Sequence, residues 1–129
     1  TQGYSSAASD VYKRQFNVSG NRLNGILNQR SNDMAVANNW NVVQYAVLLH
    51  MFAQVSGFVA GELVHVIADA HVYDRHIPSV REMLANPEYP SPKFVMNPEI
   101  KNFYDFTVDD FALEGYEATP LKQRLEVAI

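Results

Sequence analysis

The sequence of 129 residues contains no cysteine. This absence excludes a disulfide-linked scaffold, a zinc or iron–sulfur site with cysteine ligands, and a cysteine nucleophile within the chain. Charged residues are scarce at 19%, and their balance is acidic, with 14 Asp and Glu against 10 Lys and Arg. The resulting pI of about 5.4 argues against a nucleic-acid partner that is bound through bulk positive charge.

The chain also lacks an apolar run long enough to span a bilayer. The longest apolar region, residues 40–55, is interrupted by Asn41, Gln44, His50 and Gln54. A membrane-spanning helix needs about 20 apolar residues, and the N-terminus carries no apolar run of the signal-peptide type. The sequence therefore predicts no membrane segment and a cytoplasmic location.

The hydrophobic content of 47% is that of an ordinary globular chain. Residues 1–14 differ from the rest, because their first part is small and polar and shows no periodicity. We interpret residues 1–14 as a non-native or disordered leader. Residues 15–129 then form one part of a larger domain.

Local patterns predict a hairpin and a long helix in the first half. The turn signal Ser19-Gly20-Asn21 separates two short segments and predicts a β-hairpin over residues 16–31. Residues 40–55 place apolar side chains at nearly every helical angle, which predicts a helix buried on most sides. Asn38 and Asn39 precede it and are expected to cap its N-terminus.

Residues 63–73 alternate between two kinds of side chain, which predicts a strand. Its even positions are small or β-branched and apolar, and we expect them to face the core. Its odd positions include polar side chains that would share the other face. These are His65, Asp69, His71 and Tyr73.

The second half predicts shorter elements. Apolar spacings of three and four predict a helix over residues 74–85, which Asn86-Pro87 ends. Residues 93–96 and the segment after Asp109-Asp110 predict short strands.

Two short motifs suggest ligand binding. Arg30 beside Ser31 suits a phosphate, because a guanidinium fork and a hydroxyl both donate to oxyanions. The alternative is an exposed Arg and a turn Ser. Asp69, His71 and Tyr73 on one strand face could hold a sugar, or could simply face solvent.

Two further interpretations concern Asn41 and a possible metal. The Asn41 amide could cap the helix, or could read the edge of a pyrimidine by donating to a carbonyl and accepting from a ring N–H. A zinc or iron site would use imidazoles and carboxylates from His65, Asp69, His71 and His76. His65 and His71 lie about 20 Å apart along a strand, which is too far for one ion, so we predict no metal.

Taken together, these segments are more specific than any one of them. Gln29-Arg30-Ser31-Asn32-Asp33 is followed by Asn41 and Tyr45, by residues 48–54, and by Asp69-x-His71-x-Tyr73. Residues 109–116 and Val127-Ala128-Ile129 close the chain. In this order the segments resemble the C-terminal half of thymidylate synthase, from about Gln15 to Ile129.

The resemblance implies an incomplete α+β fold, with a mixed twisted sheet, a central helix buried in the core, and a sheet face used for a homodimer. It implies a methyltransferase that converts dUMP to dTMP with 5,10-methylenetetrahydrofolate as co-substrate. In that family a cysteine thiolate adds to C6 of the uracil and makes C5 a nucleophile.

The resemblance also assigns roles to single positions. Arg30 and Ser31 match residues that bind the dUMP phosphate, and Asn41 matches the amide that reads uracil O4 and N3–H. His71 and Tyr73 match the pair that binds the deoxyribose 3′-hydroxyl.

Two more positions concern the folate. Asp33 matches a carboxylate near the pterin ring, and Ile129 matches the terminal residue of a tail that folds over bound folate. Asp33 is also an expected dUMP contact, and both Asp33 and Asn41 are expected to support catalysis.

The family's cysteine position falls on Asp10, inside the predicted leader, where nothing resembles the family. We therefore expect the chain as given to be inactive. Two alternatives stay open, namely a pyrimidine-nucleotide hydroxymethyltransferase and a catalytically dead nucleotide-binding module. Asn41 favours uracil over cytosine, because a cytosine-specific member is expected to carry Asp there.

Overall fold

A computed structural model describes residues 12–122 and residue 125 of the chain. The chain divides into two compact units, one ending at Tyr73 and the other beginning at Asp74. The predicted leader up to residue 11 and the predicted contact at Ile129 lie outside the described residues.

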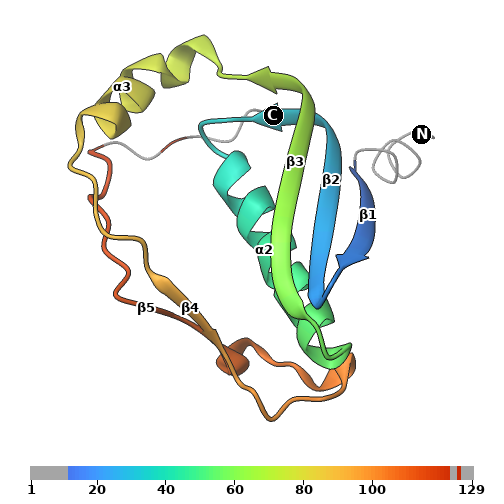
Figure 1. The fold of residues 1–129 in the computed structure, drawn as a ribbon. Helices are drawn as coiled ribbons and strands as arrows, with labels where there is room; N and C mark the ends of the chain where they lie inside the picture. The colour runs from blue at the N-terminus through green and yellow to red at the C-terminus, as the bar shows by residue number, and fades with distance from the viewer. Residues whose placement is uncertain (1–11, 123–124, 126–129) are drawn as a thin grey trace, which may run out of the picture. The chain divides into compact units, whose positions relative to one another are not determined.

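The first unit is a three-stranded sheet covered by one helix (Figure 1). Its strands are β1 (Tyr12–Ser19), β2 (Arg22–Asp33) and β3 (Val59–His71), and they lie in the order β1-β2-β3. β1 and β2 pair antiparallel, whereas β2 and β3 pair parallel. The prediction of a mixed sheet is therefore confirmed.

The predicted hairpin is present, and its turn depends on a glycine. Gly20 has φ +60°, a conformation that residues with a Cβ rarely adopt. β1 is longer than the sequence predicts, because Tyr12 already pairs with Gln29. Strand pairing thus begins within the stretch that the sequence assigns to a leader.

Helix α2 (Asn38–Val55) connects the parallel strands β2 and β3, as a crossover between parallel strands requires. It buries one stripe, formed by Tyr45, Leu49 and Ala53 at spacings of four. The expectation of a helix buried on most sides is not met among the described residues, because the sheet covers only this stripe. Trp40, on the other side, is 68% exposed.

The predicted N-cap of this helix is wrong. The cap position is Ala37, and it makes no side-chain capping hydrogen bond. The Asn38 side chain is engaged elsewhere, since its Oδ1 accepts a hydrogen bond from Nδ2 of buried Asn32 at 2.9 Å.

The face assignment of β3 is also reversed. The core cluster contains Leu23 of β2 with Leu49 and Ala53 of α2, and Leu63 of β3 packs against it. From Leu63 onward, the odd positions of β3 therefore face the helix, and the polar groups predicted for the outer face lie on this side. The even positions are exposed, with Val64 and Val66 each at 47%. The reason is that α2 covers one face of the sheet, and no described element of this unit covers the other.

The second unit contains a short helix and a small sheet (Figure 1). A 3-10 turn at Asp74–His76 leads into α3 (Ile77–Ala85), where the sequence predicts a helix. β4 (Lys93–Met96) pairs antiparallel with β5 (Phe111–Glu114), and both strands match their predictions. Two 3-10 turns, Phe103–Asp105 and Val108–Asp110, lie between them.

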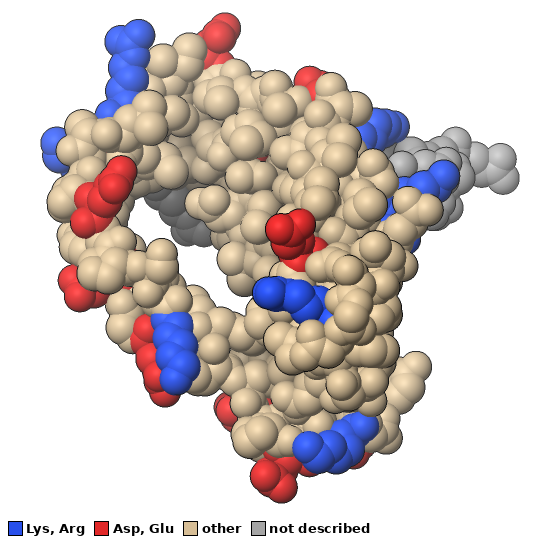
Figure 2. Space-filling view, in the orientation of Figure 1, with Lys and Arg blue, Asp and Glu red and all other residues tan. Residues whose placement is uncertain are grey.

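In Figure 2, the basic and acidic side chains are scattered over the visible face between larger uncharged areas. No helix within the described residues is long and apolar enough to cross a membrane.

Candidate functional site

In the first unit, β2 and β3 end close to where α2 begins (Figure 1). Polar side chains of these three elements contact one another there. The carboxyl ends of parallel strands, next to a helix N-terminus, are a common place for ligands in α/β units. Register places Ser31 directly beside Asp69, and Asp33 beside His71. Residues distant in the sequence are therefore neighbours at this edge.

The first group at this edge surrounds Asp69. Ser31 Oγ donates a hydrogen bond to Asp69 Oδ2 at 3.1 Å. His71 Nδ1 lies 3.5 Å from the same oxygen, which gives an ion pair only when the imidazole is protonated. The Tyr73 ring stands edge-on to the His71 ring, with 5.2 Å between centroids. The structure thus brings together Ser31, Asp69, His71 and Tyr73.

The second group is centred on Gln29, which is only 4% exposed. Its Nε2 donates to the main-chain oxygen of Ser31 at 2.8 Å and to Asn41 Oδ1 at 2.9 Å. Its Oε1 lies 2.8 Å from His65 Nε2. Gln29 therefore links both strands to the start of α2.

Asn41 does not cap the helix, because the cap position is Ala37. Its side-chain oxygen is held by Gln29 instead. The amide is half-buried and fixed in orientation, which is what a group that reads a base edge requires.

Asp33 ends β2 and shapes the turn before α2. Its Oδ1 accepts hydrogen bonds from the backbone N–H groups of Ala35 at 2.9 Å and Val36 at 3.2 Å. This carboxylate is therefore partly used by the local backbone. Met34 N–H donates to the main-chain oxygen of His71 at 2.9 Å, which ties the turn to the end of β3.

Arg30 lies in β2 beside Ser31 and is exposed. The phosphate-binding role expected for Arg30 stays a prediction.

Burial affects the ionisation of His65 in this group. Desolvation lowers the pKa of its imidazole below the ordinary value of 6.5, because a charged ring loses solvation there. The shift favours the neutral ring, and the contact with Gln29 is then a hydrogen bond between neutral groups.

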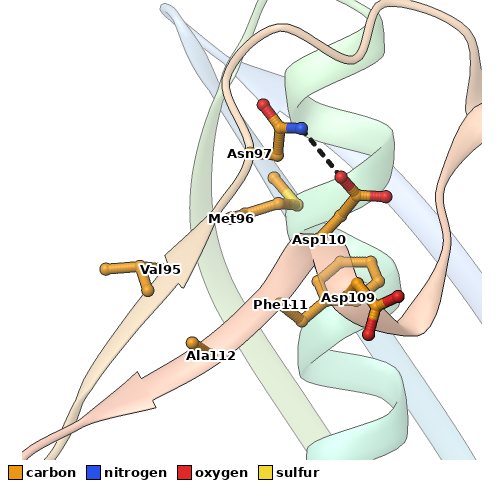
Figure 3. Close-up of a pocket in the computed structure, with 7 residues that line it drawn as sticks. All are labelled: Val95, Met96, Asn97, Asp109, Asp110, Phe111 and Ala112. Atoms are coloured by element: carbon orange, nitrogen blue, oxygen red, sulfur yellow. Dashed lines mark hydrogen bonds between the residues drawn. The ribbon is translucent and has the colours of Figure 1, made fainter.

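A separate hollow lies in the second unit, between β4 and β5 (Figure 3). It is lined by Val95, Met96, Asn97, Asp109, Asp110, Phe111 and Ala112. Asn97 Nδ2 donates to Asp110 Oδ1 at 2.8 Å, and the pKa of Asp110 is lowered by this bond and by hydrogen bonds from Thr107. The Thr107–Asp110 pair forms a capping box, so we interpret this polar group as structural.

Sequence reasoning assigned no role to Gln29 or Asn32 and considered His65 only as a metal ligand. The missing signal is the alternation of β2, whose odd positions from Leu23 to Gln29 are buried. A glutamine on such a face must find hydrogen-bond partners, which would have marked it as a hub. Within the described residues, no group of three or more His, Asp or Glu could hold a metal ion.

Comparisons with known proteins identify the family of this chain. The family model described as thymidylate synthase matches residues 9–129. A thymidylate synthase from Bacillus licheniformis is 45% identical over 119 residues, which are 92% of this chain and 42% of that protein. Thymidylate synthase 1 from Bacillus subtilis is 45% identical over 107 residues, which are 83% of this chain and 38% of that protein.

A solved structure shows the same fold. The thermostable thymidylate synthase A from Bacillus subtilis superposes with a TM-score of 0.87 at 44% identity, covering 92% of this chain and 42% of that one. The chain thus spans less than half the length of these relatives. With a family match over almost its whole length, the chain belongs to the thymidylate synthase family.

Proposed function

We propose that this chain forms the nucleotide-recognising part of a thymidylate synthase that methylates dUMP to dTMP with 5,10-methylenetetrahydrofolate. The observation that carries the proposal is the oriented Asn41 amide beside the cluster of Ser31, Asp69, His71 and Tyr73. The relatives named above are all thymidylate synthases, which favours methylation over hydroxymethylation.

Uracil is the base that the Asn41 amide suits. The Asn41 side-chain oxygen accepts a hydrogen bond from Gln29 and has a second lone pair for the base. The Asn41 side-chain nitrogen carries two hydrogens that it can donate. Uracil offers a carbonyl oxygen beside a ring N–H, so one amide satisfies both groups. In this role Asn41 holds the base and supports catalysis by binding the oxygen where negative charge develops.

The remaining residues take the sugar, phosphate and folate. His71 and Tyr73 would bind the 3′-hydroxyl, while Arg30 and Ser31 would bind the phosphate. Asp33 would lie near the nucleotide and the folate pterin. Ile129 lies outside the described residues, and its folate-covering role follows from the family pattern alone.

The reaction further needs a thiolate that adds to uracil C6, and the chain has no cysteine. We therefore expect no turnover from the 129 residues alone. Tritium release from C5-labelled dUMP with methylenetetrahydrofolate should equal the no-protein background. Release that depends on the chain would contradict the assignment of a cysteine nucleophile.

We also propose that two copies pair through the exposed even face of the sheet. Val64 and Val66 leave apolar surface uncovered there, and contiguous exposed apolar surface often marks an interface.

Binding of dUMP to the chain tests the proposed function. Arg30→Ala should lower dUMP affinity at least about tenfold, because a charge-assisted contact to phosphate is lost. Arg22→Ala is the matched control, since Arg22 is also exposed and lies at the far end of the same strand. The measurement is an NMR titration with dUMP, at low ionic strength.

The unsubstituted nucleoside deoxyuridine gives a second control, because it lacks the phosphate. Arg30→Ala should leave its weak binding unchanged. Equal losses in the two arginine variants, or equal losses for nucleotide and nucleoside, would contradict the phosphate role of Arg30.

A further inference from the structure

The side-chain amide of Gln29 has only one orientation that satisfies its neighbours. Its nitrogen lies 2.8 Å from the main-chain oxygen of Ser31, which can only accept a hydrogen bond. The atom at that position must therefore be the NH2 group. It follows that Gln29 Oε1 faces His65 Nε2 at 2.8 Å.

This orientation fixes the two groups beyond it. Because Gln29 Oε1 accepts, His65 must donate from Nε2, so its neutral ring is the Nε2–H tautomer. Because Gln29 Nε2 donates its second hydrogen to Asn41, the atom of Asn41 that faces it at 2.9 Å must be the oxygen. His65, Gln29 and Asn41 thus form a directed chain of hydrogen bonds.

We propose that His65, acting through Gln29, is a positioning residue that locks the Asn41 amide in the orientation that accepts uracil and rejects cytosine. The inference rests on the proposed function, since it concerns how the same site discriminates between bases. His65 does not touch the nucleotide in this proposal.

The chemistry of the two bases shows why orientation decides. Uracil presents an acceptor at O4 and a donor at N3, whereas cytosine presents a donor at N4 and an acceptor at N3. An asparagine amide turned by 180° exchanges its donor and acceptor and would match cytosine. An asparagine at this position therefore does not by itself select uracil. Its discrimination between uracil and cytosine depends on the group that holds Asn41 Oδ1.

Burial makes this lock effective. Gln29 is 4% exposed, so water has little access to replace a lost partner. Without the His65 donor, Gln29 Oε1 would be left unpaired, and the Gln29 side chain would keep only the bonds made by its NH2 group. A side chain held at one end only can turn away from Asn41, and the Asn41 amide could then adopt the orientation that suits cytosine.

The test compares dUMP and dCMP binding to the 129-residue chain by NMR titration. His65→Leu removes the donor, and His65→Gln keeps a donor that can reach Gln29. We expect the unsubstituted chain to prefer dUMP at least tenfold, His65→Leu to reduce this preference about tenfold, and His65→Gln to restore most of it. A purely structural role would weaken both nucleotides equally and leave the preference unchanged.

A second measurement needs no variant. The 15N shifts of the His65 ring in the unsubstituted chain report its tautomer, and we expect Nε2–H at pH 7.5. An Nδ1–H tautomer would overturn the lock, and so would an unchanged preference in His65→Leu. In both cases dUMP binding would survive, and the proposed function with it. If the unsubstituted chain binds neither nucleotide, the proposed function falls and this inference falls with it.

Discussion

At the residue scale, two buried amide side chains of the first unit are held by specific hydrogen bonds. Buried Gln29 and Asn32 each bond to an asparagine at the start of α2, namely Asn41 and Asn38. Buried polar groups without partners are costly, which is why these pairs form. The two asparagines at the start of α2 therefore bond to side chains of the sheet and do not cap the helix.

The acidic group of the second unit gives a prediction about ionisation. The Asp110 carboxylate accepts from Asn97 Nδ2, from the Thr107 N–H at 2.8 Å and from Thr107 Oγ1 at 2.9 Å, and these bonds lower its pKa. A lowered pKa in the folded state stabilises the fold above the ordinary carboxyl value of 3.8, and this contribution is lost as the pH falls through the folded pKa.

Asn97→Ala should raise the pKa of Asp110 towards its ordinary value, because Asn97 is the largest cause of the shift. Carbon-13 NMR of the Asp110 carboxyl during an acid titration measures this change. Asn102→Ala is the control, since Asn102 donates to a different carboxylate, Asp105, at 3.4 Å. An Asp110 titration that is the same in both variants would show that the Asn97 bond does not form in solution.

At the element scale, strand β2 is the centre of the first unit. It pairs with β1 on one edge and β3 on the other, and its odd side chains pack under α2. Leu27 is 1% exposed, whereas its neighbour Ile26 is 38% exposed on the opposite face.

The face assignment of the sheet is therefore testable with two adjacent substitutions. Leu27→Ala should lower the free energy of unfolding by about 2–5 kcal/mol, because it leaves a cavity in a packed core. In the monomer, Ile26→Ala should cost less than about 1 kcal/mol, because the Ile26 side chain is partly solvated there. Urea unfolding followed by circular dichroism gives both values, and a larger cost at Ile26 would reverse the face assignment.

Local sequence patterns predicted the elements but not the side of β3 that is covered. The hairpin, the long helix and the strands at Lys93–Met96 and Phe111–Glu114 follow from turn residues and periodicity. The two-faced pattern of residues 63–73 indicated a strand correctly. Alternation cannot say which face a helix covers, since that depends on where the crossover from β2 places α2.

The candidate site was predictable in part for the same reason. The sequence indicated that Asp69, His71 and Tyr73 share a face, because a period of two is local information, and the structure groups them with Ser31. The Gln29 hub depends on side chains from β2, β3 and α2 meeting at one point. A local sequence pattern cannot predict such a contact between three elements. The binding roles of Arg30, Asp33 and Ile129 stay predictions.

At the scale of the whole molecule, the even face of β3 from Val64 to Ala70 is apolar but exposed to solvent. The even face of β3 carries Val64, Val66, Ala68 and Ala70, all exposed, and Ile26 of β2 lies on the same side. β-Branched residues on a sheet normally pack against another layer. The described residues of this unit provide α2 for the opposite face only, so a second copy is the proposed cover.

Placing a charge on this face should separate the copies. The unsubstituted chain should elute as a dimer in size-exclusion chromatography with light scattering, and Val66→Lys should shift it to a monomer because a lysine would be desolvated between two apolar sheets. Leu84→Lys is the matched control, since Leu84 is an apolar residue of α3 that is 82% exposed and lies in the other unit. A dimer that persists in Val66→Lys but dissociates in Leu84→Lys would move the interface away from the sheet, whereas a monomeric unsubstituted chain would remove the proposed pairing altogether.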